Sequence, residues 1–313
     1  MISVAMATYN SEKFVEQQLD SIRTQSCPPD ELIICDDGSV DKTELIVQNF
    51  IEIHGLQNKW QFVKNTHNKK WSRNTLDCAK MTKGEIIFLC NDDDIWLPSR
   101  IETMIYTLNQ HKEIKVLLSR YKTVVEDGIT LAPHSDSYFN DDGKFIKINV
   151  VTALRRLTFG AAAMVVQRSA LNEIYDVSYE NDLPMDLAIA IFAAARNELG
   201  ILNTVTMLRW IHSNNVSAPA NSLRKKLKQF QQRIQIRKNF SYFYHHMSPL
   251  ITPYMTEKNI KNLKKIEKSM IKRANAIENR NFFTIACDLF TFNPMMNLRW
   301  ILADLYVAIF GSQ

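Results

Sequence analysis

The stretch that decides the fold runs from Glu85 to Pro98 and reads Glu-Ile-Ile-Phe-Leu-Cys-Asn-Asp-Asp-Asp-Ile-Trp-Leu-Pro. Its first six residues are an apolar run of the kind that forms a buried strand. Three adjacent carboxylates, Asp92 to Asp94, follow almost at once. Because like charges at the end of an apolar strand repel one another, a positive group is needed beside them. A hard divalent cation with oxygen ligands meets that need. The alternative is a solvated acidic turn that caps the next helix.

Strand-like and helix-like segments alternate along the first hundred residues. Strands are expected at residues 2–7, 31–35, 60–64 and 85–90, and helices at residues 11–26, 42–54 and 74–82. This alternation is typical of an α/β fold, with a mostly parallel sheet, right-handed crossovers and flanking helices.

Polar side chains follow three of these strands at the point where each one ends. They are Thr8-Tyr9-Asn10, Asp36-Asp37-Gly38-Ser39 and Asn91-Asp92-Asp93. In parallel sheets, ligands bind beyond the carboxyl ends of the strands. The three clusters therefore converge on one edge, which favours the cation site over the solvated turn.

The rest of the chain has mixed character and then changes composition. Helices are expected at residues 100–111 and 186–195, strands at 116–119, 160–166 and 201–209, and a flexible loop at 126–144. After Pro219 the sequence becomes rich in Lys, Arg and Gln. We therefore expect a catalytic domain at 1–218, divided into halves at 1–100 and 101–218, and a basic helical extension at 219–313.

Length and composition describe an ordinary folded protein. The chain has 313 residues, of which 46% are hydrophobic and 23% charged. Its five cysteines have no repeated spacing, which disfavours a disulfide framework or a zinc site. No signal peptide is visible and no apolar stretch is long enough to span a membrane, so a cytoplasmic location is expected. Charge is uneven, because residues 221–280 hold 15 Lys and Arg against 3 Glu.

Four motifs in order resemble the inverting, nucleotide-sugar-dependent glycosyltransferases of GT-A fold. They are Val4-Ala5-Met6-Ala7-Thr8-Tyr9-Asn10, Glu31-Leu32-Ile33-Ile34-Cys35-Asp36-Asp37-Gly38-Ser39, Ile87-Phe88-Leu89-Cys90-Asn91-Asp92-Asp93-Asp94-Ile95-Trp96 and Arg209-Trp210-Ile211-His212-Ser213-Asn214-Asn215-Val216-Ser217. The resemblance covers about residues 1–218. The Asp-Asp-Ile-Trp-Leu-Pro run is most similar to the bacterial rhamnosyltransferase-type branch, which builds O-antigen, capsule or cell-wall polysaccharide.

The resemblance implies a donor site with a divalent metal, Mn²⁺ or Mg²⁺, that neutralises the leaving diphosphate. The family's Asp-x-Asp falls on Asn91-Asp92-Asp93, with Asp93 as a metal ligand and Asn91 in place of the first acid. His212 matches the family's late histidine near the diphosphate or metal. Residues implied to contact the nucleotide are Thr8, Tyr9, Asn10, Asp36, Asp37, Arg73, Asn91 and Asp92.

The resemblance also implies a general base and a sugar pocket. Inversion needs a carboxylate that takes the proton of the acceptor hydroxyl. Asp186 matches that acid, with Asp182 as the fallback, and the alternative role of Asp186 is a helix N-cap. Residues expected near the sugar or acceptor are Gly160, Ala161, Asp94 and Trp96.

The expected function is therefore transfer of a sugar, with inversion, from a UDP- or dTDP-sugar to a growing, lipid-linked cell-surface glycan. The basic helices at 223–237 and 259–273, and the apolar segment at 282–310, are expected to contact the inner face of the membrane. The alternative is packing on the core with a solvated basic face. No nucleic-acid-binding module is recognisable.

Two other function classes remain open at this stage. A metal-dependent phosphoryl-transfer enzyme could also use an Asp cluster at a strand end, although no phosphate-cradling Gly-rich loop is present. A non-catalytic nucleotide-sugar-binding protein of the same fold is compatible with Asn91 and with the unusual neighbours of Asp186.

Overall fold

The computed structural model describes residues 1–126, 141–156, 160–212, 223–279 and 281–290. Most of the loop expected at 126–144, the end of the late motif after His212, and residues 291–310 of the expected apolar anchor lie outside the described residues. The described chain divides into two compact units: residues 1–148 with 158–218, and residues 149–157 with 219–313.

The first unit is built on one mixed sheet, and its first half is parallel. The strands β1 (Ile2–Thr8), β2 (Glu31–Asp36), β3 (Trp60–Lys64) and β4 (Ile86–Cys90) stand in the order β3-β2-β1-β4, all parallel. This arrangement confirms the four strands expected from the apolar runs. The register sets Thr8 opposite Asp36 and Met6 opposite Cys90. The ends of β1, β2 and β4 therefore meet at one edge.

The second half of the sheet runs in both directions. Its strands are β5 (Asp94–Trp96), β6 (Val116–Val125), β7 (Phe145–Lys147), β8 (Met164–Gln167) and β9 (Leu199–Ile211). β8 is antiparallel to β4 and β6, β6 is parallel to β9, and β5 and β7 are each antiparallel to β9. The fold class is thus confirmed as a mixed, mostly parallel α/β sheet. The short strand β5 was not expected, because a helix cap was anticipated near Asp94.

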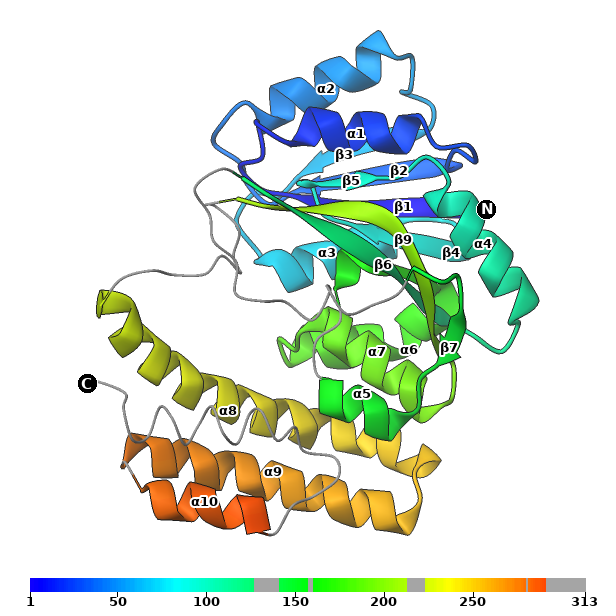
Figure 1. Cartoon of the computed structure of the whole chain (residues 1–313). Helices are drawn as coiled ribbons and strands as arrows, with labels where there is room; N and C mark the ends of the chain where they lie inside the picture. The colour runs from blue at the N-terminus through cyan, green and yellow to red at the C-terminus, as the bar shows by residue number, and fades with distance from the viewer. Residues whose placement is uncertain (127–140, 157–159, 213–222, 280, 291–313) are drawn as a thin grey trace. The chain divides into compact units, whose positions relative to one another are not determined.

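Helices cover both faces of this sheet. They are α1 (Val15–Arg23), α2 (Thr43–Ile53), α3 (Trp71–Met81), α4 (Arg100–Gln110), α6 (Arg168–Glu180) and α7 (Met185–Ala195), with the 3₁₀ turn η2 (Ala161–Ala163) before β8. Figure 1 shows α1 and α2 on one face and α3 on the other. The α1 face is packed by alternate strand residues, because side chains of a strand alternate between faces. Buried residues of this layer include Val4, Met6, Leu32, Ile34, Phe88, Val15, Leu19 and Ile22.

The second unit is helical. It contains α5 (Val150–Arg156), α8 (Leu223–Ile251), the 3₁₀ turn η3 (Thr252–Tyr254), α9 (Glu257–Glu278) and α10 (Phe282–Phe290). The stripe formed by Leu263, Ile266, Met270 and Ile277 on α9 is buried, whereas the lysines between these positions are exposed. Thr256 caps α9, since its side chain accepts a hydrogen bond from the Asn259 amide.

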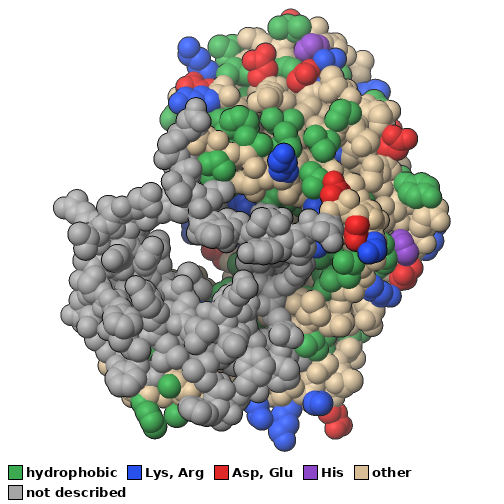
Figure 2. Space-filling model, in the orientation of Figure 1, with side chains coloured by type: hydrophobic (Ala, Val, Ile, Leu, Met, Phe, Trp, Pro, Cys, Tyr) green, Lys and Arg blue, Asp and Glu red, His purple; other side chains and the backbone are tan. Residues whose placement is uncertain are grey.

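The described residues differ in surface charge between the two units, and their helices are short or polar relative to a bilayer span. Within the described residues, no helix combines the length and apolar composition needed to cross a bilayer. On the first unit, acidic and basic side chains are interspersed over the surface around α1 and α2 (Figure 2). The concentration of positive charge seen in the sequence belongs instead to the helices of the second unit.

Candidate active site

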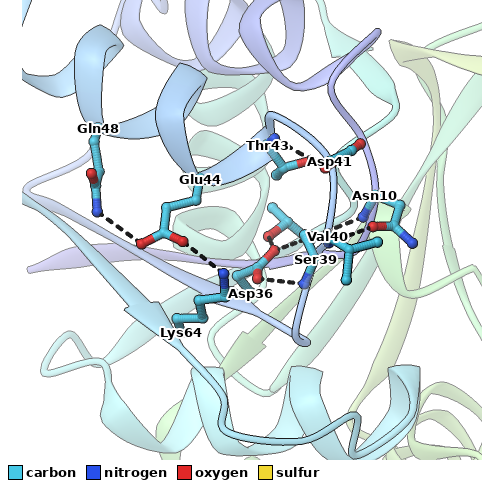
Figure 3. A network of polar contacts seen from close by, with 10 residues as sticks. Asn10, Asp36, Ser39, Val40, Asp41, Thr43, Glu44, Gln48 and Lys64 are labelled. Atoms are coloured by element: carbon cyan, nitrogen blue, oxygen red, sulfur yellow. Dashed lines mark hydrogen bonds and ion pairs between the residues drawn. The ribbon is translucent and has the colours of Figure 1, made fainter.

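The end of β2 carries a buried carboxylate that ties two loops together. Asp36 is fully buried and accepts hydrogen bonds from Thr8 Oγ1 (3.0 Å), from the Ser39 amide (2.8 Å) and from Ser39 Oγ. Ser39 Oγ in turn accepts from the Asn10 amide (2.8 Å), and Asn10 Oδ1 accepts from the Val40 amide (3.0 Å) (Figure 3). Gly38 allows this turn, because its φ of +83° is left-handed. Asp36 therefore fixes the shape of the edge.

Asp37 connects the same edge to the segment that precedes α3. Its Oδ1 accepts from Asn65 Nδ2 (3.0 Å) and from the Lys69 amide (2.8 Å), and the side chain is 3% exposed. Tyr9 on the neighbouring loop is half exposed, so its ring is available at the edge. The predicted nucleotide-contacting residues Thr8, Tyr9, Asn10, Asp36 and Asp37 thus lie together.

The acidic run at the end of β4 crowds several carboxyl groups into little solvent. Asp92 Oδ2 accepts from the Tyr9 amide (2.9 Å), which links β4 to β1. Burial, with repulsion from Asp93, raises the pKa of Asp92 to about 7. Burial also raises the pKa of Asp93, although His212 and Arg209 offset part of the rise. Burial therefore disfavours the ionised form of both carboxyl groups, and added positive charge would favour it.

Asp93 and His212 face each other across 119 residues of sequence. His212 Nε2 lies 3.2 Å from Asp93 Oδ2, and His212 is 6% exposed. The Phe14 ring stacks on the imidazole with 4.2 Å between ring centroids. Phe14 therefore fixes the plane of His212. The sequence did not predict the stacking of Phe14 on His212, because the helix pattern around Phe14 gives no sign of a distant ring partner.

Asp94 and Trp96 are the first and last residues of β5, and both lie in the interior. Each is 2% exposed, so neither side chain reaches an open sugar or acceptor surface. The Trp96 ring packs against the Arg100 guanidinium, 4.7 Å from the ring centroid. Burial and Asp93 raise the pKa of Asp94 to about 8, and neither carboxylate oxygen makes a well-formed hydrogen bond to another described residue.

Asn91 has a partner that the sequence did not predict. Its Oδ1 accepts from Trp71 Nε1 at 3.4 Å, so the first turn of α3 touches the acidic edge. Ser72, the next residue, accepts through Oγ from the Met185 amide (3.1 Å) and donates to the Leu183 carbonyl (2.9 Å). The beginning of α3 therefore joins the acidic edge to the segment that leads into α7.

Asp186 lies in the first turn of α7, immediately after that joined segment. Its Oδ1 accepts from the Leu187 amide (2.8 Å). Burial raises the pKa of Asp186 to about 6, with the hydrogen bond lowering it in part. A carboxylate with a pKa near 6 is well matched to taking a proton near neutral pH.

Arg73 and the fallback acid Asp182 contact each other. Arg73 Nε lies 3.3 Å from Asp182 Oδ1, and the guanidinium lies over the Tyr179 ring at 5.2 Å. Arg73 thus faces the end of α6. Gly160 is exposed, with open space where a Cβ would lie, whereas Ala161 is buried.

The residues present fit a divalent cation that completes its coordination with substrate. Within the described parts of the chain, no three His, Cys, Asp or Glu side chains gather into a protein-only metal site. Mg²⁺-type sites commonly use one or two carboxylates together with substrate phosphates. Asp93 and His212 can supply two ligands, and the carboxyl groups crowded at this edge, with raised pKa values, favour added positive charge.

The mixed sheet, with its acidic edge beyond the parallel strands, defines a GT-A-type nucleotide-binding fold. The family is shown by sequence: residues 3–174 match the model of glycosyl transferase family 2, and the chain belongs to that family.

Relatives include the Escherichia coli UDP-Glc:alpha-D-GlcNAc-diphosphoundecaprenol beta-1,3-glucosyltransferases WfgD and WfaP. WfgD is 25% identical over 177 residues, which are 55% of this chain and 62% of WfgD. WfaP is 22% identical over 250 residues, 79% of this chain and 89% of WfaP. The chain spans less than two thirds of the length of most of the curated relatives it matches first.

Solved structures share the fold at low identity. Staphylococcus aureus TarS 1-349 in complex with UDP-GlcNAc has a TM-score of 0.57 at 16% identity, covering 98% of this chain and 89% of TarS 1-349. The mannosyltransferase PcManGT from Pyrobaculum calidifontis, in complex with GDP-Man and Mn²⁺, has a TM-score of 0.55 at 16% identity, covering 98% and 85%.

Proposed function

We propose that this chain is an inverting glycosyltransferase that moves a sugar from a nucleoside-diphosphate donor to a lipid-linked glycan acceptor. The observation that carries the proposal is the pair Asp93 and His212, 3.2 Å apart at the end of β4 and tied to β1 through Asp92 and Tyr9. Residues 1–100 would bind the donor, residues 101–218 the acceptor, and residues 219–313 form the helical extension.

The donor is held by the edge that Asp36 and Asp37 shape. Tyr9 offers an exposed ring for the base, and the neighbouring loops place Thr8 and Asn10 beside it. Asp93 and His212 would hold the divalent cation, with Asn91 and Asp92 flanking it. Such a cation stabilises the negative charge that develops on the leaving diphosphate.

Asp186 acts as the general base. The acceptor hydroxyl gives its proton to the Asp186 carboxylate as its oxygen forms a bond to the anomeric carbon. The bond between that carbon and the diphosphate oxygen breaks on the opposite face, and the nucleoside diphosphate leaves. Ser72 Oγ donates to the Leu183 carbonyl and accepts from the Met185 amide, and these two hydrogen bonds support this role because they hold the base segment against the start of α3.

The relatives support an acceptor that carries a lipid diphosphate. WfgD and WfaP are described as acting on GlcNAc-diphosphoundecaprenol with UDP-Glc, and the TarS structure holds UDP-GlcNAc. We therefore assign a UDP- or dTDP-sugar as donor. The Asp-Asp-Ile-Trp-Leu-Pro run continues to favour the rhamnosyltransferase-type branch, in O-antigen, capsule or cell-wall polysaccharide synthesis.

An acceptor of this kind sits in a membrane, and α9 offers a surface that suits one. Exposed lysines recur along it, at Lys261, Lys264, Lys265, Lys268 and Lys272. Clustered Lys side chains attract anionic headgroups. We propose peripheral contact with the cytoplasmic face of the membrane through this helix.

Turnover separates this function from its alternatives. Wild-type protein with Mn²⁺ should release UDP or dTDP from one of the candidate nucleotide sugars, and Asp93→Ala should not. A protein that binds a donor without any turnover would be the non-catalytic member of the fold. Release of inorganic phosphate without sugar transfer would favour phosphoryl-transfer chemistry.

A further inference from the structure

A basic cavity of about 330 Å³ opens beside the segment that leads to Asp186. We call it the Lys70 cavity. Its walls come from the loop before α3, the first turn of α3 and the end of α6. The lining residues are His67, Asn68, Lys69, Lys70, Arg73, Tyr179 and Asp182.

Most charged side chains in this lining are positive. Two of them, Lys70 and Arg73, form long, exposed ion pairs. Asp182 faces Lys70 at 3.8 Å and Arg73 at 3.3 Å, and all three side chains are between 38% and 79% exposed. Exposed ion pairs of such length contribute little to stability. A phosphate oxygen makes shorter, charge-assisted bonds with Lys and Arg. An incoming phosphate can therefore displace Asp182 from these two cations.

Two further features indicate that the cavity is built for a ligand. Tyr179 lies under the Arg73 guanidinium at 5.2 Å and limits its orientation. Lys70 and Asp182, which face each other across the cavity, both have left-handed backbone, with φ of +71° and +50°. Such conformations are strained in non-glycine residues and often occur at ligand sites.

The position of the cavity favours the acceptor over the donor as the source of that phosphate. Asp182 precedes the proposed base Asp186 by four residues, and Ser72 ties the two segments together. The Trp71 side chain, by contrast, contacts Asn91 at the donor edge. The Lys70 cavity therefore borders the base segment through Asp182, and neither Asp93 nor His212 is among its lining residues.

We propose that the Lys70 cavity binds the diphosphate of the lipid-linked acceptor, with Lys70 and Arg73 exchanging their contact with Asp182 for phosphate oxygens. This proposal rests on the function proposed above, and it adds a site that would select acceptors carrying phosphate near the sugar.

Calorimetry with a water-soluble probe tests the site without requiring turnover. The probe is GlcNAc α-diphosphate bearing a short alkyl chain, titrated into protein saturated with UDP and Mn²⁺. Lys70→Gln and Arg73→Gln should each weaken its binding about tenfold, and Asp182→Asn should tighten it severalfold. Lys80→Gln, which removes a lysine from the exposed far end of α3, is the matched control and should leave binding unchanged.

Two further arms identify the source of the phosphate and separate this proposal from the general function. Alkyl GlcNAc without phosphate should lose no affinity in the cavity variants, and UDP with Mn²⁺ should bind Lys70→Gln as it binds wild type. Equal losses for both GlcNAc probes, or weakened UDP binding alone, would overturn the proposal. Transfer activity with unaltered probe binding in the variants would refute the cavity and leave the function standing. If probe binding depends on Lys70 and Arg73 but no donor is turned over, the cavity stands and the proposed function is refuted.

Discussion

Replacing Asp186 by Asn should stop transfer and at the same time stabilise the protein. Burial raises the pKa of Asp186 from 3.8 to about 6, so ionising this group costs folding free energy. That cost is absent below pH 4, grows between pH 4 and 6, and is complete above pH 6. Its size at pH 7.5 is about 3 kcal/mol, from a rise of about two pKa units at 1.36 kcal/mol for each tenfold change in acid constant. Asn keeps the shape and the acceptor for the Leu187 amide but cannot ionise.

Two measurements test this prediction. Urea unfolding should show Asp186→Asn more stable than wild type at pH 7.5 and equal to it at pH 4. Wild-type kcat/KM should rise with pH around a midpoint of about 6 and should be about a tenth of its plateau at pH 5. The kcat/KM of the Asn variant should be about 10²–10⁴-fold lower than that of wild type. Asp176→Asn is the matched control, since that carboxylate is exposed on α6. Intact transfer in Asp186→Asn, or loss in Asp182→Asn alone, would refute the assignment of the base.

Four other perturbations follow from the same structure. Asp93→Ala should remove the rise in melting temperature that Mn²⁺ with UDP produces in wild type; an undiminished rise would place the cation elsewhere. Lys264→Glu with Lys268→Glu should abolish sedimentation with vesicles containing anionic lipid, and wild-type binding that is insensitive to salt would exclude the electrostatic contact. Gly84→Ala should destabilise the fold by about 1–3 kcal/mol, because an added Cβ would lie 2.7 Å from the Met1 carbonyl oxygen. Gly160→Ala, which meets open space, should leave stability unchanged and raise KM for the donor if Gly160 borders the sugar.

The parallel half of the sheet was predictable because its strands are continuous apolar runs. The strand Trp60–Lys64 agrees with the expected bounds, and β1, β2 and β4 agree within one residue at each end. Buried parallel strands can be recognised as continuous apolar runs from their local sequence alone. The strand β5 left no such signal, because Asp94–Trp96 is only three residues long and becomes a strand only by pairing with Met207–Arg209.

The residues of the candidate site also divide into those that the sequence predicts and those that it does not. Residues at strand ends, such as Asp36 and Asp93, could be placed from the order of strands alone. The partners of Arg73 could not, because Asp182 and Tyr179 reach it from α6 and the loop beyond, whose packing is a tertiary property. The burial of Trp96 was likewise not predictable, because the acidic motif beside it does not reveal which aromatic side chains pack into the core.

The stereochemistry of the product tests the central claim most directly. Wild-type protein, Mn²⁺, the UDP- or dTDP-sugar that supports turnover and a lipid-diphosphate acceptor should yield one glycoside whose anomeric configuration, read by NMR, is opposite to that of the donor. A product that retains the donor configuration, or no glycoside with any donor, would contradict an inverting transferase with Asp186 as its base.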